Sequence, residues 1–445
     1  MTYDDLVKES RTFFRNNRGC KIRTSENMIE NLKTYSETIE KFANHAYPVI
    51  HETVLDLIHN FIMFKRAHGS KIEKKLYESM TLVEFLDRLI SKRPLAFLTA
   101  ADSWLLKNGH FGAGGWEEIG TDKEGSTYEA LTLDNFLSYD EVKIAALLQL
   151  SSPSVTINDG SRHNVGRKGE DGSYVDAGVY VGAVGARFEM EGRMEYQDML
   201  VTPQQNTEAA GYGLNNSRES VLKVFAKFYN MENFHSYEEA KNSKDMYKGI
   251  DFSQDLLNKE IYTKRIQISA ETFLIESEQR GISENKDIYC HVVGLGLGVW
   301  QISRDQNKYF LKAWVQAIKE LKISKVKDID FSWIAKNGEV GQLEDGKQFQ
   351  GVNIHFSRRN PFDPLPPKDQ DKLIVAMFAW DGNSYVGNEY WNGHLSASGD
   401  PAAASCSTIP ELLNPDINWR NIRGSNVKIA SREKGLVSIN QFIKA

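Results

Sequence analysis

One continuous apolar run, from Leu373 to Ala379, constrains the fold of this chain more than any other segment. The run reads LIVAMFA and contains no polar position. A strand with one solvated face alternates apolar and polar residues, whereas a strand covered on both faces is apolar throughout. The run therefore predicts a buried strand, in a sheet that other elements cover on both sides.

Other short apolar runs after Leu150 alternate with helical patterns. Strands are predicted at 155–157, 179–184, 288–293 and 352–356, and helices at 221–228 and about 309–321. Strands that alternate with helices indicate an α/β layered domain with a sheet at its centre. We therefore expect one α/β domain over residues 151–445.

The first 150 residues carry helical signals instead. Two capping boxes, Thr81–Glu84 and Ser138–Glu141, each precede an apolar stripe at helical spacing. Residues 26–66 fit two further amphipathic helices that are separated near Pro48. The sequence thus predicts an N-terminal helical region over residues 1–150.

Charge and cysteine content exclude several classes of protein. The chain has 54 basic and 60 acidic residues, so it has no basic excess to neutralise nucleic-acid phosphates. Its three cysteines, Cys20, Cys290 and Cys406, are far apart, which argues against a disulfide framework or a structural zinc site. No apolar run approaches the roughly 20 residues that span a bilayer, and the polar N-terminus lacks the apolar core of a secretory signal peptide. We expect no nucleic-acid partner, no membrane span and a reducing compartment.

Polar or glycine-rich sequence follows four of the predicted strands. In open α/β sheets, ligands bind outside the carboxyl ends of the strands. The segments at these positions are Asn158–Arg162, Gly294–Trp300, Ser357–Asn360 and Trp380–Asn383. Together they predict a ligand site at one edge of the sheet.

The glycine segment allows two interpretations. Gly294, Gly296 and Gly298 leave backbone N–H groups unhindered ahead of a predicted helix, which suits a diphosphate. The same pattern fits a tight turn where a helix packs on a strand, so its spacing leaves both interpretations open.

The loop after the apolar run is rich in carboxylates. Asp381, Glu389 and Asp400 fall within twenty residues. Carboxylates gathered in a cleft can orient a water, act as a base or stabilise a sugar cation. Spacing alone favours structural roles, namely a turn at Asp381-Gly382 and an N-cap at Asp400 ahead of Pro401. Aromatic residues that could stack on a base or sugar lie in the same loop: Trp380, Tyr385, Tyr390 and Trp391.

Other chemistry has little support in the sequence. The spacing of Arg187 and Glu195 favours a structural ion pair. Cys290 and His291 are adjacent on a predicted strand, so their side chains point to opposite faces. No HExxH motif occurs among the ten histidines. We therefore expect neither a metal nor a cofactor.

Several of these segments, in this order, resemble one known family. The motifs are NDGSR, VGARFE with MEYQ, GYG, GLGLGVW, SRRNPFD and, most specifically, DGNSYVGNEYW with SGDPAAA. They are similar to macrodomain-like ADP-ribosylhydrolases, the family that includes the Legionella effector MavL. The resemblance covers roughly residues 150–418.

The resemblance implies a macrodomain-like layered α/β core with a mixed sheet that binds ADP-ribose and removes it from modified proteins, notably from arginine. It implies catalytic roles for Asp381, Glu389 and Asp400. The motif MEYQ resembles the acidic signature of poly(ADP-ribose) glycohydrolases, which has two adjacent glutamates. Glu195 stands at one of these positions in this chain, and Tyr196 stands at the other. The ligand-binding residues that it implies are Asn158, Asp159, Gly160, Glu195, Gly294, Leu295, Gly296, Leu297, Gly298, Val299, Trp300, Asn383, Gly387, Asn388, Trp391 and Ala402.

The first expectation for function is therefore an ADP-ribosylhydrolase that removes mono-ADP-ribose from a modified host protein, as a secreted bacterial effector in the host cytoplasm. The alternative is a reader module that binds ADP-ribose without cleaving it. We expect residues 1–150 to select the protein substrate or to bind a host protein, so that their deletion spares ADP-ribose binding.

Overall fold

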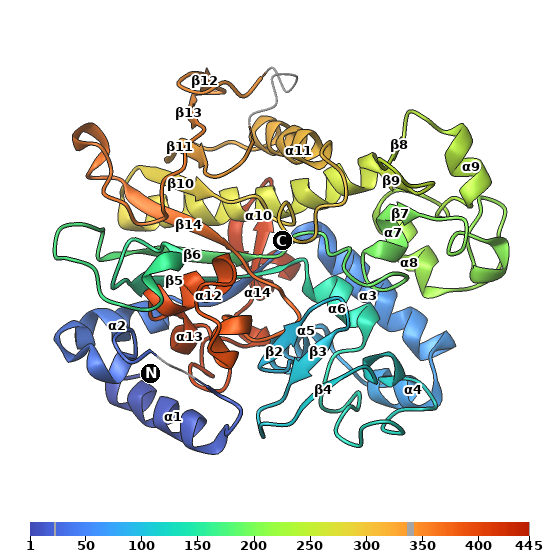
Figure 1. The fold of residues 1–445 in the computed structure, drawn as a ribbon, viewed down its shortest axis with the longest axis horizontal. Coiled ribbons are helices and arrows are strands. Elements are labelled where there is room, and N and C mark those ends of the chain that lie inside the picture. Colours follow the sequence, from blue (N-terminus) through green and yellow to red (C-terminus); the bar gives the residue numbers. More distant parts are fainter. Residues whose placement is uncertain (22–23, 336–341, 445) are drawn as a thin grey trace.

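The computed structural model describes residues 1–21, 24–335 and 342–444, and its centre is a ten-stranded mixed sheet (Figure 1). The strands follow the order β12-β13-β11-β10-β14-β6-β5-β1-β15-β16. In that order their bounds are Gln348–Phe349, Val352–His355, Val326–Phe331, Ile288–Val292, Leu373–Ala379, Ala177–Ala183, Leu148–Val155, Tyr47–His51, Lys428–Ser431 and Gly435–Ser438. The predicted α/β class with a mixed sheet is confirmed.

Five neighbouring strands in the middle of the sheet, from β13 to β6, run parallel. Their carboxyl ends therefore meet at one edge of the sheet. Strand β5 pairs antiparallel with β6, so its carboxyl end lies at the opposite edge. This change of direction decides which of the predicted loops can share a site.

Strand β14 coincides with the apolar run at 373–379, and its five inner residues are buried. Helices cover the sheet on both faces. Ser151 in β5 bonds to Glu276 of the long helix α10 (Lys259–Glu284). Tyr180, which opposes the next residue of β5, contacts Cys406 of helix α12 (Gly399–Cys406). Since neighbouring positions of a strand point to opposite faces, α10 and α12 lie on opposite sides of the sheet.

The other helices surround this core (Figure 1). They are α1 (Tyr3–Asn16), α2 (Ser36–Asn44), α3 (Glu52–His68), α4 (Lys71–Tyr77), α5 (Leu82–Ser91), α6 (Tyr139–Ala145), α7 (Tyr196–Met199), α8 (Val221–Phe228), α9 (Tyr237–Asn242), α11 (Gln306–Glu320), α13 (Ile409–Leu412) and α14 (Ile439–Lys444). Two small sheets join β2 (Ala96–Leu98), β3 (Ser103–Leu105) and β4 (Phe111–Ala113), and β7 (Leu200–Val201), β9 (Leu256–Asn258) and β8 (Tyr247–Gly249). Each helix in the described ranges is too short or too polar to cross a membrane.

Most of the predicted elements are confirmed. Both predicted capping boxes start helices, α5 and α6. The strand predicted at 155–157 is wrong in extent, because β5 covers 148–155. Helix α10 and strand β11 were not predicted.

The first 150 residues are not purely helical. Between α2 and α3, residues 47–51 form strand β1, which lies inside the central sheet between β5 and β15. Pro48, expected as a break between two helices, lies in this strand. The N-terminal region therefore contributes a strand to the same sheet that the rest of the chain forms.

Candidate functional site

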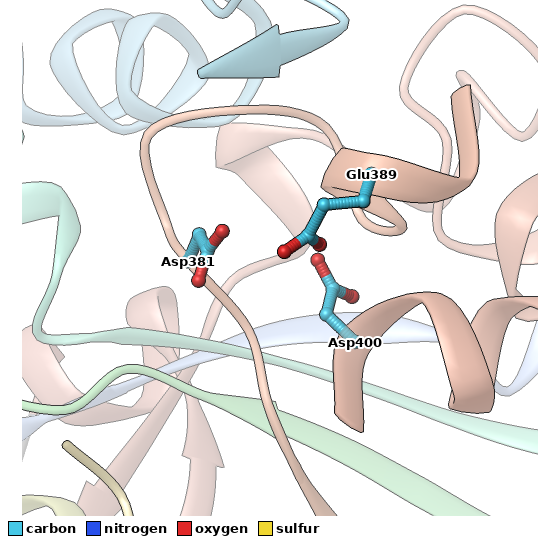
Figure 2. Close-up of side chains that lie close together, drawn as sticks. All are labelled: Asp381, Glu389 and Asp400. Atoms are coloured by element: carbon cyan, nitrogen blue, oxygen red, sulfur yellow. The ribbon is translucent and has the colours of Figure 1, made fainter. Parts of the chain in front are cut away.

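Three carboxylates meet beyond the end of strand β14. Asp381 follows the strand, Glu389 lies on the 3-10 helix η7 (Asn388–Asn392), and Asp400 lies in the first turn of α12. One oxygen from each carboxylate lies within 4.8 Å of the other two. Figure 2 shows the three side chains directed into the same space. We call this group the acidic cluster.

Each carboxylate is held by a neighbour in the chain. The amide of Asn388 donates a hydrogen bond to Asp381. The Ser398 hydroxyl lies 3.3 Å from Glu389, to which it donates. The backbone N–H of Gly387 donates to Asp400 over 2.9 Å. Gly387 has φ +104, a conformation that favours glycine, so this donor depends on the glycine.

Asp400 is not an N-cap, as its position before Pro401 had suggested. Helix α12 begins at Gly399, with Ser398 as its N-cap, and Asp400 lies one residue inside the helix. Its side chain is fully buried, and within the described ranges its Oδ2 atom has no hydrogen-bond partner. A buried carboxylate with one free oxygen is costly to ionise, which argues for a role beyond helix capping.

Burial dominates the electrostatics of the acidic cluster. Burial, reinforced by the negative charge of Glu389, raises the pKa of Asp381 to about 8. Burial also raises the pKa of Glu389. Burial and the charge of Asp381 hold the pKa of Asp400 well above its usual range. The cluster therefore retains protons at neutral pH, which general acid catalysis requires.

The raised pKa of Asp381 predicts a pH-dependent stability. Its pKa is near 4 in an unfolded chain and about 8 in the folded protein. The contribution of this group to stability is thus complete below pH 4 and is lost as the pH rises through 8. We expect the thermal unfolding temperature to fall between pH 6 and pH 9, and to fall less in Asp381→Asn. An equal fall in both proteins would contradict the raised pKa.

The cluster is also a group of described side chains that could hold a metal ion, because three carboxylate oxygens within 4.8 Å suit a hard cation. The same oxygens can instead share protons. The expectation that no metal takes part stays a prediction.

A second ring of contacts comes from the N-terminal region. The Phe97 backbone in β2 binds the side chain of Asn388 twice, accepting from its amide nitrogen and donating to its amide oxygen. Asp102, between β2 and β3, pairs with Arg187 at 2.6 Å. The charge of Arg187 in turn offsets part of the rise that burial causes in the pKa of Asp381. Sequence reasoning missed Phe97 and Asp102, because nothing local connects them with a loop almost 300 residues away.

Arg187 and Glu195 do not form the predicted ion pair. The Glu195 carboxylate is buried and pairs with Arg265 of α10 at 2.6 Å. Its other oxygen accepts the backbone N–H of Arg187. Both oxygens of Glu195 are therefore already bound, which supports a structural role for the side chain; its place among the ligand-binding residues stays a prediction.

The glycine loop, residues 294–298, follows β10, the neighbour of β14. A Cβ atom on Gly185, which follows β6, would lie 2.3 Å from the Gly296 nitrogen. Segments from β6 and β10 thus meet at the end of β14, beside the acidic cluster. In this loop Leu295 is buried, and directly after it Val299 is 92% exposed and Trp300 is buried. Helix α11 begins only at Gln306, so the loop does not form the helix N-terminus that the sequence suggested.

The Asn158 loop lies elsewhere. Asn158, Asp159 and Gly160 follow β5, whose carboxyl end is at the edge opposite the acidic cluster. Their polar groups are used locally: Asn158 binds Arg167 and Gly160, and Asp159 accepts from Asn360. The expectation that these residues share a site with the acidic cluster is not supported, because the rule for strand ends requires parallel strands.

The remaining predicted residues lie in residues 380–404, the segment that contains the acidic cluster and that we call the acidic loop. Gly387 and Asn388 hold carboxylates, as described above. Asn383 is buried with its amide nitrogen free of partners in the described ranges, and Ala402 is buried in α12. The four aromatic side chains of the loop are buried too: Trp380, Tyr385, Tyr390 and Trp391. Trp391 packs between Phe13 and Tyr390, so it supports the loop and does not offer a free face for stacking.

Known proteins resemble this chain over most of its length. A family model described as ADP-ribosylhydrolase MavL-like matches residues 6–445. A Drosophila melanogaster protein named ADP-ribosylarginine hydrolase CG3568 is 39% identical over 428 residues, which are 92% of this chain and 82% of the relative. A second Drosophila melanogaster protein, named ADP-ribosylarginine hydrolase CG2909, is 32% identical over 439 residues, 94% of this chain and 86% of the relative.

Proposed function

We propose, because this chain belongs to the family of MavL-like ADP-ribosylhydrolases, that it releases ADP-ribose from ADP-ribosylated arginine in a protein. The observation that carries the proposal is the acidic cluster, three carboxylates at the carboxyl end of a parallel strand, of which Asp381 holds its proton at neutral pH. The names of the two Drosophila relatives support arginine as the modified residue. The order of the sequence motifs supports a macrodomain-like core as part of this proposal.

The chemistry follows from the charges of the acidic cluster. Hydrolysis breaks the bond between the anomeric carbon of the ribose and a guanidine nitrogen, and water supplies a hydroxyl group to the carbon. Asp381 holds a proton at neutral pH and gives it to the departing nitrogen. A second carboxylate, when ionised, takes the proton of the water and stabilises the positive charge that develops at the anomeric carbon.

The glycine loop has the place and the backbone for the diphosphate. Gly296 lies against Gly185, the neighbour of Val184, and Val184 lies against Gly382 beside Asp381. Gly298 has open space where a side chain would stand. Backbone N–H groups of such a loop bind phosphate oxygens well. Phosphates at this loop would direct the distal ribose toward Asp381.

Incubation with two modified proteins tests the proposed activity. The purified chain should release free ADP-ribose from a protein modified at arginine and much less from one modified at serine. The departing atom is a guanidine nitrogen in the first case and a hydroxyl oxygen in the second, and the two differ in how they accept a proton from the acid. Mass spectrometry of both products measures the release. Binding of ADP-ribose without release from either protein would instead identify a reader.

The role of residues 1–150 in selecting a substrate, and secretion into a host cytoplasm as a bacterial effector, stay part of the proposal. A pocket of about 390 Å³, lined mostly by this region together with Arg193 and Gln197, supports the first part, because its lining includes Tyr139, which binds Asp102 beside Arg187. Localisation of a tagged chain in infected cells tests the second part; retention in the producing cell would count against it.

A further inference from the structure

Arg93 is a buried arginine without a hydrogen-bond partner in the ranges that the structure describes. It lies two residues after helix α5 and is 2% exposed, and none of its three guanidinium nitrogens is bonded there. Burial lowers the pKa of Arg93 to about 9. A buried charge without a partner destabilises a fold, so its presence needs an explanation. Four other buried arginines each pair with a carboxylate: Arg88, Arg187, Arg265 and Arg280.

The guanidinium group of Arg93 lies over one ring of the acidic loop. Its central carbon is 4.6 Å from the centre of the Trp380 ring, and Trp380 is 1% exposed. The face of an indole ring attracts a cation, and it does so more strongly where water is excluded. Trp380 is fixed by two further bonds, because its backbone N–H donates to the Ala183 carbonyl at 3.0 Å and its indole N–H donates to the Ser384 carbonyl at 3.2 Å. Arg93 therefore contacts the residue directly before Asp381.

A second contact joins residues 91–94 to the acidic loop beyond Asp381. The backbone N–H of Tyr385 donates to the Pro94 carbonyl at 3.0 Å, and its hydroxyl donates to the Ser91 carbonyl at 3.3 Å. Residues 91–94 therefore hold the acidic loop on both sides of Asp381.

We propose that Arg93 is a positioning residue, which holds the Trp380 ring and thereby keeps Asp381 directed into the acidic cluster. The inference rests on the proposed function and adds a residue that acts through another side chain. The reaction needs the three carboxylates in one space, as Figure 2 shows them, and a shift of about 1 Å can lower a rate by about 10²-fold. An apolar side chain of the same length would destabilise the core less, but it would lack the attraction between charge and ring.

Arg93→Met tests the inference, because methionine keeps an unbranched side chain of similar reach and removes the charge. For release of ADP-ribose from ADP-ribosylarginine, kcat should fall about tenfold and KM should stay within about twofold. The thermal unfolding temperature should rise, because an unpaired charge leaves the core. Amide hydrogen exchange of residues 380–391, measured by mass spectrometry, should become faster. Arg93→Lys keeps a positive charge beside the ring and should restore most of kcat.

Arg88→Met is the matched control, because Arg88 is also buried, lies in α5 and pairs with Glu141 at 2.5 Å. This variant should have a lower unfolding temperature, since it leaves a buried carboxylate unpaired. Below that temperature, its kcat and its exchange in residues 380–391 should equal those of the original protein.

Unchanged kcat in Arg93→Met, or a lower kcat together with a lower unfolding temperature, would overturn the inference. Failure of the proposed function is a different result, in which the original protein itself releases no ADP-ribose. The exchange of residues 380–391 then still tests the inference, because equal exchange in Arg93→Met and the original protein would show that Arg93 does not hold the loop.

Discussion

Replacement of Asp381 by asparagine should lower kcat for release of ADP-ribose from ADP-ribosylarginine by about 10²–10⁴-fold, the usual contribution of a general acid. The folded protein should be at least as stable as before. Three carboxylates within 4.8 Å repel one another when ionised, and burial adds to that cost. An amide in place of Asp381 removes one of these charges and can still accept the hydrogen bond from Asn388.

Two measurements on the same protein separate a catalytic from a structural Asp381. Single-turnover release gives the chemical step, and thermal unfolding at pH 8 gives stability. If Asp381 has a purely structural role, the variant should have lower stability together with lower activity. If Asp381 is the catalytic acid, the variant should have lower activity and equal or higher stability. Glu284→Gln, at an exposed ion pair with Lys41, is the control and should change neither. Full activity of Asp381→Asn would rule out Asp381 as the acid.

The sheet could be predicted from the sequence where its strands are apolar on both faces. The run 373–379 is the clearest case, because β14 lies in the middle of the sheet between β10 and β6. Helix α10 could not be predicted in this way. It is buried around most of its surface and carries buried ionic residues such as Arg265, Glu271 and Glu276, so it shows no single apolar stripe.

The acidic loop was found from residues close together in sequence, but its partners were not. Asp381, Glu389 and Asp400 lie within twenty residues of one another in the sequence, so a local pattern brings them together. The supports at Phe97 and Asp102 depend on the small β2-β3-β4 sheet folding against that loop. The separation of the Asn158 loop from the acidic cluster was not predicted for a different reason. Hydrophobic patterns give the position of a strand but not its direction, and β5 runs opposite to β6.

Deletion of residues 1–150 should prevent folding, in contrast to the expectation from sequence that it spares ADP-ribose binding. The deletion removes β1 from between β5 and β15, together with the start of β5 itself. The edges of β5 and β15 would lose their strand partner, and the apolar surface that Val49 and Ile50 now cover would face water. Both changes favour aggregation. We expect an insoluble chain, or a soluble one without a cooperative thermal transition by circular dichroism.

A truncation after Ser438 is the control for this deletion, because it removes α14 beside the edge strand β16 and leaves β1 in place. It should fold and bind ADP-ribose. A soluble chain 151–445 that unfolds cooperatively and binds ADP-ribose would show that the sheet tolerates the loss of β1. If the N-terminal region instead affects activity only through its contacts with Asn388, then Asn388→Ala in the full chain should fold and lose activity. Asp381 would then lose its link to Phe97. We therefore expect the N-terminal region to affect catalysis through the sheet and the contact between Phe97 and Asn388.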